Sequence, residues 1–318
     1  MCDLNLLGVA ISTYKRPDDL RKCLTCLFHQ DYEFDLFIVD NASGDKTLQV
    51  LQEFSSMHQN MQYEVLSKPN PSAIQTINYA LRKLHNKYVV ILDDDTFLYD
   101  STILRKLVST ANTDDNIAIV ACNVRDCTGK ISFVLKTPFF DATDYPHVSD
   151  DEIFDVDDFS GACALFRRSL VGPMFYDESY ALYWNESDLA IRMVANGHRV
   201  VINQRAIVIH GSNVNRESCR SFYYGSMNTF RLMNKVLGRK QSFVFTCILL
   251  PFHIKRYLSM YKEPKFFIYS IKCAISWIRN FYWIFFMDKI HFNDHTVEMR
   301  VKNTYIKYYL KELMLSLP

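Results

Sequence analysis

The chain has 318 residues, 49% of them hydrophobic, so it can bury the core of one large domain or of two moderate ones. Its net charge of +1 hides an asymmetry, because residues 1–219 carry 20 Lys and Arg against 30 Asp and Glu, whereas residues 220–318 carry 16 against 5. This basic part also holds 22 of the 45 aromatic residues, among aliphatic runs rather than arginine clusters, which argues against nucleic acid as the partner.

Short apolar runs alternate with helical patterns over the first 120 residues. The apolar runs predict strands over residues 6–11, 35–39, 63–66, 88–92 and 117–120. The helical patterns predict helices over residues 17–27, 45–54 and 72–84, and a fourth that begins at Asp100 or Ser101. Pro17 suits a first helical position, and Asp45 is expected to cap the second helix. This alternation predicts an α/β fold with a mainly parallel sheet and helices on both faces.

The pattern changes after residue 135. Two prolines and the acidic run 150–158 predict a long, mobile loop over 136–158, whose charges are expected to be solvated. A buried apolar segment over 159–170 follows, then a helix over 186–195 that ends at Asn196-Gly197. Two short strands are predicted at 199–202 and 206–209, and the chain is expected to be helical after about residue 217.

The C-terminal region contains no convincing transmembrane span. The run 243–252 is too short, and 266–287 is interrupted by Lys272 and Arg279. Lys272, Ser276 and Arg279 form one polar stripe among aromatic residues, which predicts an amphipathic helix in a membrane interface. A helix packed on the protein itself is the alternative. We expect a catalytic domain over 1–216 and a helical, basic and aromatic region over 217–318.

Cysteine spacing and the N-terminus indicate a cytoplasmic protein. Nine cysteines show no disulfide framework, and the pairs Cys23–Cys26 and Cys122–Cys127 lack a second pair at zinc-ligand spacing. Free thiols are therefore expected. The first residues carry no basic region followed by a long apolar core, so no secretory signal is visible.

The triplet Asp93-Asp94-Asp95 directly follows the strand predicted at 88–92. In open α/β sheets, ligands bind at the carboxyl ends of strands. Three adjacent carboxylates repel one another unless a cation lies between them, and Mg²⁺ and Mn²⁺ prefer such oxygen ligands. The triplet therefore indicates a metal and phosphate site, with a solvated acidic turn as the alternative.

Six stretches in this order resemble the family 2 glycosyltransferases, which have the GT-A fold: residues 9–17, 38–43, 93–95, 159–168, 184–192 and 208–212. The resemblance covers about residues 5–235. It is strongest toward the rhamnosyltransferase-like and galactofuranosyltransferase-like enzymes of bacterial surface polysaccharides. Residues 223–231 also resemble a helix that follows the catalytic segment in that group.

The resemblance implies a donor site at the carboxyl ends of the strands. The residues that it assigns to donor binding are Thr13, Tyr14, Arg16, Asp40, Asn70, Asn78, Asp93 and Asp94. Among them, Asp40 is expected to accept hydrogen bonds from the donor's base. The chain has Pro71-Ser72 where relatives have a glycine-containing turn, which puts the geometry of the donor loop in question.

The resemblance also implies a metal site and a catalytic base. Asp95 is the expected direct ligand of Mn²⁺ or Mg²⁺, with Asp93 beside it and His210 as a further ligand or phosphate contact. Relatives begin the next helix with Glu-Asp-x-Asp, so Glu186 falls on the usual catalytic aspartate and Asp188 on the following acid. Glu186 is the favoured base, because Asp188 is also explained as a carboxylate in the first turn of a helix.

The implied activity is inverting, metal-dependent sugar transfer from a UDP- or dTDP-sugar to a glycan or lipid-linked acceptor at the inner face of the plasma membrane. A nucleotidyltransferase is one alternative, but residues 12–17 lack the glycine-rich loop of those enzymes. A non-catalytic sugar- or membrane-binding scaffold is the other. The oligomeric state does not follow from the sequence.

Overall fold

The computed structural model describes residues 6–70, 72–130, 153–172, 175–211, 219–245, 289–303 and the single positions 247, 275 and 306. The strands are β1 (Leu7–Thr13), β2 (Asp35–Asp40), β3 (Met61–Val65), β4 (Tyr88–Leu92), β5 (Thr96–Leu98), β6 (Ile117–Arg125), β7 (Ile153–Asp155), β8 (Cys163–Arg167) and β9 (Arg199–His210). The helices are α1 (Pro17–Phe28), α2 (Asp45–Met57), α3 (Ala73–Lys83), α4 (Ile103–Ala111), α5 (Arg168–Val171), α6 (Asn185–Ala195) and α7 (Cys219–Val236). Residues 239–245 and 295–303 are also helical.

Local signals in the sequence explain several helix ends. Helix α1 begins at Pro17, whose missing N–H is not needed in a first turn. Helix α6 ends before Gly197, which adopts the left-handed φ of +84° that glycine tolerates best. The prediction for α2 was wrong by one position, because Gly44 is its N-cap and Asp45 is already helical.

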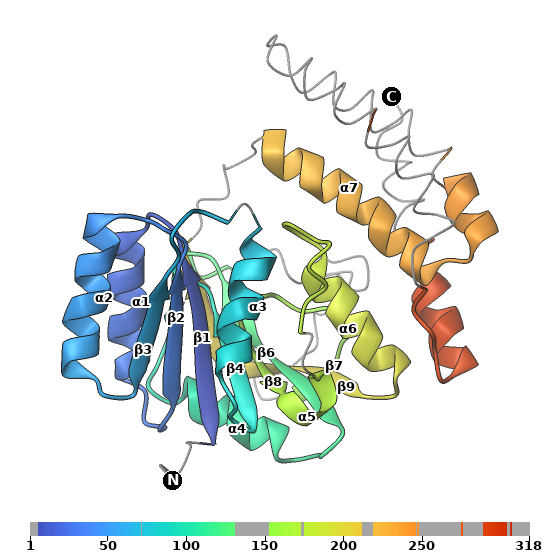
Figure 1. The fold of residues 1–318 in the computed structure, drawn as a ribbon. Helices are drawn as coiled ribbons and strands as arrows, with labels where there is room; N and C mark the ends of the chain where they lie inside the picture. The colour runs from blue at the N-terminus through green and yellow to red at the C-terminus, as the bar shows by residue number, and fades with distance from the viewer. Residues whose placement is uncertain are drawn as a thin grey trace.

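The described strands form one nine-stranded sheet in the order β3-β2-β1-β4-β8-β6-β9-β5, with β7 paired to β9 (Figure 1). Strands β3, β2, β1 and β4 are parallel, as are β6 and β9. Strand β8 runs antiparallel between β4 and β6, and β5 and β7 run antiparallel to β9. The expected α/β fold is therefore confirmed, although the sheet is more mixed than predicted, because an apolar run carries no information on strand direction.

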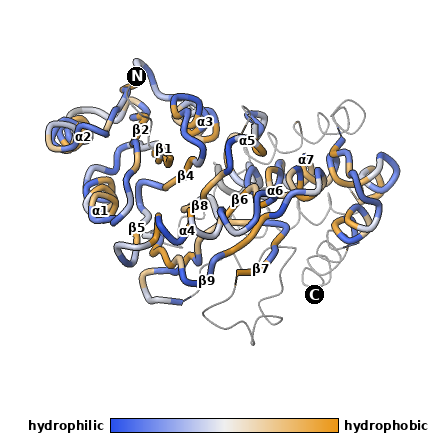
Figure 2. Tube along the Cα trace, turned by 90° about the horizontal axis from the view of Figure 1, so that it is seen from below, coloured by the Kyte–Doolittle hydropathy of each residue, from blue (hydrophilic) through white to orange (hydrophobic). Residues whose placement is uncertain are grey.

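Helices cover both faces of the sheet. Residues of α1, α2 and α4 pack on one face in one apolar cluster, and residues of α3, α5 and α6 pack on the other face in a second cluster. Figure 2 shows the hydrophobic strands between these two helical layers. The parallel strands β1, β2 and β4 read as almost uninterrupted apolar runs because both of their faces are buried.

Two predictions after residue 135 need correction. The strands predicted at 199–202 and 206–209 are one strand, β9, whose pairing with β6 shifts register after Asn203. Of the predicted loop, residues 136–152 lie outside the described residues, but 153–155 form β7. Asp157 and Asp158 are buried rather than solvated, because β7 and the start of β8 bring them under α6 and the helix at 295–303.

A third apolar cluster joins the C-terminal part to α6. Ile191 of α6 packs with Phe230 and Met233 of α7 and with Val301 of the helix at 295–303. In Figure 1, α7 runs beside α6, away from the parallel half of the sheet. Within the described part of the chain, no helix combines the length and the apolar character needed to cross a bilayer. The amphipathic helix predicted at 266–287 lies outside the described residues, apart from position 275.

Candidate active site

The acidic triplet forms the tight connection between β4 and β5. The backbone N–H of Thr96 donates to the Asp93 carbonyl at 3.0 Å, which closes a turn over the three carboxylates. The Asp93 N–H donates to the Ala162 carbonyl at 3.0 Å, so the segment before β8 lies beside the turn. The triplet thus stands at the carboxyl end of β4, at the upper edge of the sheet in Figure 1.

Asp93, Asp95 and His210 form a cluster that can hold a metal ion. One potential ligand atom from each side chain lies within 4.8 Å of the other two. His210 Nε2 is 3.1 Å from Asp95 Oδ1 and 3.6 Å from Asp93 Oδ2. The antiparallel pairing of β5 with β9 places Thr96 opposite His210 and so brings the histidine to the triplet. Two carboxylates and an imidazole suit a divalent cation such as Mn²⁺, and carboxylate oxygens also suit Mg²⁺.

Asp94 ties the end of β1 to the triplet. Its Oδ2 accepts a hydrogen bond of 2.8 Å from Thr13 Oγ1, and its Oδ1 accepts one of 3.1 Å from Arg16 Nη1. The same Arg16 nitrogen donates to Asp95 Oδ2 at 2.6 Å. Thr13 and Arg16, both assigned to donor binding from the sequence, therefore also hold two of the carboxylates, while Tyr14 is exposed beside them. Asp94, which the resemblance assigned to donor binding, thus joins the end of β1 to the triplet.

The three carboxylates differ in pKa because their partners differ. Partial burial and the nearby carboxylates raise the pKa of Asp93 despite the opposing effect of His210, and half of this side chain is exposed. Burial raises the pKa of Asp94 to about 6, with Arg16 opposing it. Burial also disfavours the charge of Asp95, but His210 and Arg16 outweigh it and lower the pKa of this group. Asp95 is thus the carboxylate that stays ionised most readily.

Glu186 lies in the first turn of α6, next to the segment that borders the triplet. A Cβ atom built on Gly161 would come within 2.3 Å of Glu186 Oε1, so the carboxylate occupies the space that this glycine leaves free. The neighbouring Ala162 carbonyl accepts the Asp93 N–H, so Glu186 and Asp93 border the same short segment. Burial raises the pKa of Glu186, so its proton is more easily regained than that of a solvated glutamate.

Asp188 lies against α7 instead. Its side chain has 0% exposure, and its Oδ1 accepts a hydrogen bond of 2.6 Å from Lys235 Nζ of α7. Its Oδ2 accepts one of 2.9 Å from Arg192 Nε in the same helix. These bonds enclose the carboxylate and join α6 to α7, which favours Glu186 over Asp188 as the base. Its helical spacing could not reveal a partner 47 residues away.

The residues predicted to bind the nucleotide lie at the ends of β2 and β3. Asp40 is buried, and its Oδ1 accepts hydrogen bonds from the backbone and the hydroxyl of Ser43. Its Oδ2 is buried and has no hydrogen-bond partner among the described residues, and burial raises the pKa of this group. Asn70 forms a reciprocal pair with Asn41, since its N–H donates to Asn41 Oδ1 at 2.6 Å and its carbonyl accepts from Asn41 Nδ2 at 2.9 Å.

Asn78 has a structural position instead. Its Nδ2 donates to the Tyr176 carbonyl at 2.7 Å and to Glu178 Oε1 at 3.3 Å, and its Oδ1 accepts from the Tyr176 N–H at 3.1 Å. Both N–H groups of the amide are therefore used within the protein. These contacts leave no amide N–H of Asn78 for the donor. The charges of Glu186 and Asp93 also act on Tyr176, whose backbone is held by Asn78.

Asp158 is a buried residue beside the start of α6 that the sequence did not reveal. Its Oδ2 accepts a hydrogen bond of 2.9 Å from Ser187 Oγ, one residue after Glu186, and its Oδ1 accepts one of 2.8 Å from the Phe159 N–H. Burial raises the pKa of Asp158 to about 7. The preceding Asp157 pairs with Arg300 at 2.7 Å. The acidic run obscured both residues, because a charge run is usually solvated.

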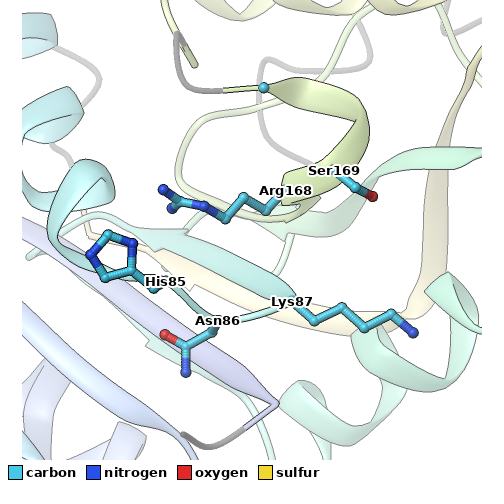
Figure 3. A pocket seen from close by; sticks show the side chains of 6 residues that line it. His85, Asn86, Lys87, Arg168 and Ser169 are labelled. Atoms are coloured by element: carbon cyan, nitrogen blue, oxygen red, sulfur yellow. The ribbon is translucent and has the colours of Figure 1, made fainter.

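A hollow of about 430 Å³ lies elsewhere, at the amino end of β4. His85, Asn86, Lys87, Arg168, Ser169 and Gly172 line it. In Figure 3 the Arg168 side chain extends toward His85, and its guanidinium donates to the carbonyls of Leu81 and Leu84 at the end of α3. Arg168 therefore closes a helix terminus. This hollow is at the opposite end of β4 from the triplet, and none of the predicted site residues lines it.

The model of the family described as glycosyl transferase family 2 matches residues 8–175. This stretch is more than half of the chain, and it contains the ends of β1, β2 and β4 together with the triplet. The chain belongs to this family. It is therefore a glycosyltransferase, and the nucleotidyltransferase and scaffold alternatives are set aside.

Curated relatives match shorter stretches of this glycosyltransferase. The poly(ribitol-phosphate) β-N-acetylglucosaminyltransferase TarS of Staphylococcus aureus is 26% identical over 99 residues, which is 30% of this chain and 17% of that protein. A dolichyl N-acetyl-α-D-glucosaminyl phosphate 3-β-D-2,3-diacetamido-2,3-dideoxy-β-D-glucuronosyltransferase of Methanococcus voltae is 24% identical over 91 residues, or 28% of each chain. The chain thus spans less than a third of the length of these two relatives.

Solved structures confirm the GT-A fold. The mannosyltransferase PcManGT of Pyrobaculum calidifontis, in complex with GDP-mannose and Mn²⁺, is similar over 100% of this chain and 77% of its own, with a TM-score of 0.56 and 15% identity. Residues 1–349 of S. aureus TarS with UDP-GlcNAc are similar over 96% and 91%, with a TM-score of 0.60 and 13% identity. GalNAc-T7 with UDP, GalNAc and Mn²⁺ is similar over 89% and 56%, with a TM-score of 0.60 and 12% identity.

Proposed function

We propose that this glycosyltransferase inverts the anomeric carbon as it moves a sugar from a nucleoside diphosphate to an acceptor hydroxyl. Glu186 takes the proton of that hydroxyl while the oxygen attacks the anomeric carbon. The bond from this carbon to the diphosphate breaks, and its electron pair leaves with the phosphate oxygen. One observation carries the proposal: the cluster of Asp93, Asp95 and His210 and the Glu186 carboxylate both border the segment Gly161–Ala162 beside the carboxyl end of β4.

In this proposal Asp95, Asp93 and His210 would hold Mn²⁺ or Mg²⁺, which would neutralise the negative charge of the departing diphosphate. The donor set of the cluster supports this role, and so does the Mn²⁺ in the similar structures of PcManGT and GalNAc-T7. Arg16 lies on the other side of Asp95 and adds a fixed positive charge to the phosphate region.

The nucleotide binds along the ends of β1, β2 and β3 in this proposal. Thr13, Tyr14, Arg16, Asp40 and Asn70 border this region. The Asp40 oxygen that lacks a partner among the described residues can accept an N–H of the base. UDP-GlcNAc and GDP-mannose, which similar proteins bind, and UDP- or dTDP-sugars of the rhamnosyl and galactofuranosyl type are the donors to compare.

A screen of sugar nucleotides tests the donor and the metal together. The panel is UDP-GlcNAc, UDP-galactofuranose, UDP-glucose, dTDP-rhamnose and GDP-mannose, each with MnCl₂ or with EDTA. We expect at least one donor to raise the melting temperature by several degrees with Mn²⁺, because a ligand of the folded state stabilises it by RT ln(1 + [L]/Kd). Release of the nucleoside diphosphate should fall to background with EDTA. Turnover that EDTA leaves unchanged would remove the metal from the proposal.

Replacement of Gly161 tests the position of the base. In Gly161→Ala the new methyl group collides with the end of the flexible Glu186 side chain, so the carboxylate moves while the fold remains. We expect transfer to fall about 10- to 100-fold with little change in melting temperature, since a displacement of about 1 Å has an effect of that order. Gly238→Ala is the matched control, because its methyl group meets no atom within 4 Å. Equal transfer by the two variants would contradict the placement of Glu186.

The region over 217–318 is proposed to attach the enzyme to the cytoplasmic face of the plasma membrane, where lipid-linked precursors of bacterial surface polysaccharide are acceptors. Its basic charge supports this, and so do exposed Phe243 and Val244, which follow exposed Arg239 and Lys240. The full-length protein should float with phosphatidylglycerol vesicles at low salt and less with neutral phosphatidylcholine. Absence of flotation with either vesicle would refute this attachment.

A further inference from the structure

The two residues before α6 adopt an unusual backbone conformation. Tyr183 has a φ of +64° and Trp184 a φ of +67°, although neither is glycine. L-residues with a side chain enter this left-handed region only when their surroundings hold them there, and such residues concentrate at functional sites. Trp184 is the N-cap of α6, and Glu186 follows two positions later. The conformation of this corner, defined as residues 182–184, therefore determines where the Glu186 carboxylate points.

Helix α7 holds the corner through polar contacts. Asn228 Nδ2 donates to the Leu182 carbonyl at 2.6 Å and to the Tyr183 carbonyl at 3.2 Å. Trp184 Nε1 donates to the Gly225 carbonyl at 3.1 Å. Asn228 is 1% exposed, so water does not compete for these bonds. One buried amide thus satisfies two consecutive carbonyls of the strained corner.

The same side of α7 also contacts α6 itself. Gly225, Asn228 and Lys235 are three and seven positions apart, which places them on one face of a helix. Lys235 Nζ reaches Asp188, two residues after Glu186, at 2.6 Å. Helix α7 therefore contacts the chain on both sides of Glu186, and the carboxylate lies between two points of attachment.

From these contacts we infer that Asn228 is a positioning residue: it holds the Tyr183–Trp184 corner in the left-handed conformation and thereby keeps the Glu186 carboxylate beside Gly161, next to the acidic triplet. This inference rests on the proposed role of Glu186 as the base. It makes α7 a working part of the transfer site, although it belongs to the basic C-terminal region and lies 42 residues further along the chain than Glu186.

Asn228→Leu is the test, because leucine has a similar volume and no donor. Asn234→Leu is the matched control on the same helix: Asn234 is also buried, and its amide finds no hydrogen-bond partner among the described residues. A crystal structure of Asn228→Leu should show Tyr183 or Trp184 outside the left-handed region and the Glu186 carboxylate moved away from Gly161. An unchanged corner would overturn the inference. Asn228→Asp, which keeps the shape but replaces the donating nitrogen, serves if the leucine variant does not fold.

Activity gives a second readout over the same panel of sugar nucleotides, with octyl β-glycosides as acceptor probes. Asn228→Leu should lower kcat for transfer about 10- to 100-fold with the KM for the donor within about 2-fold, because only the base moves. Asn234→Leu should keep wild-type kcat. A purely structural role would lower the melting temperature but leave kcat per folded enzyme unchanged, and that result would overturn the inference.

Relief of the strained corner separates the positioning role of Asn228 from the role of Glu186 as the base. Asparagine tolerates the left-handed region better than tyrosine, so in a Tyr183→Asn background the loss caused by Asn228→Leu should shrink to about 3-fold or less. An equal loss in both backgrounds would overturn the positioning mechanism. Glu186→Gln is measured in parallel. If it retains transfer, the role of Glu186 fails; if it loses transfer while Asn228→Leu keeps both the corner and kcat, only the present inference fails.

Discussion

Asp95→Asn is expected to lower sugar transfer by about 100- to 1,000-fold, which is the usual effect of losing one group that stabilises charge in a transition state. The change removes the negative charge from the residue that contacts both His210 and Arg16. Asp95 is also the carboxylate of the triplet whose pKa is lowered, so it carries its charge at neutral pH. Initial rates of nucleoside diphosphate release, measured over a range of MnCl₂ concentrations, should show both the lower rate and a higher requirement for the ion.

Asp115→Asn is the control for this experiment. Asp115 is 99% exposed at the other end of the sheet, where it pairs with Arg167, so its loss should leave the rate and the Mn²⁺ dependence unchanged. Melting temperatures of both variants show whether the fold is retained, because Asp95→Asn leaves Arg16 and His210 with less negative charge nearby. A folded Asp95→Asn variant with wild-type rate and Mn²⁺ dependence would exclude Asp95 from the metal site.

Apart from the three-residue strand β5, which was not predicted, the order of strands and helices up to β6 could be predicted because each element carries its own local signal. Buried parallel strands are continuous apolar runs, and α1 and α6 have proline and glycine at their ends. The position of β8 in the sheet could not be predicted in the same way. Whether Cys163–Arg167 pairs with β4 or lies at an edge depends on long-range packing, and its apolar residues are compatible with both.

Residues of the site could be proposed from the sequence where a motif ends a strand, since strand ends meet at one edge. Asp93, Asp95 and His210 are such residues, and the structure brings them together. Partners that come from distant elements carried no such signal. The contact of Asp188 with Lys235 and that of Asn228 with the corner each join segments more than 40 residues apart. Both belong to α7, which the charge asymmetry made look like a separate attachment region.

Glu186→Gln should lower transfer about 100- to 10,000-fold and leave the melting-temperature shift with donor and Mn²⁺ unchanged, because the amide keeps the shape of the side chain but cannot accept a proton. The pH profile identifies the base. Burial raises the pKa of Glu186 above its ordinary 4.5, and the base works without its proton. The wild-type kcat should therefore fall as the pH drops toward this raised pKa, and this limb should be absent from the residual activity of the variant.

The matched comparison is Asp188→Asn, which also replaces a carboxylate of α6 by an amide. Because Asp188 is fully buried against Lys235 and Arg192, this change leaves two cations short of a partner and should lower the melting temperature. Its folded fraction should keep the acidic limb of the pH profile, since the base is still present. If instead Asp188→Asn lost that limb and Glu186→Gln retained it, the proton would be taken by Asp188. Helix α6 would then have to turn in the working enzyme to present the Asp188 side chain to the acceptor hydroxyl.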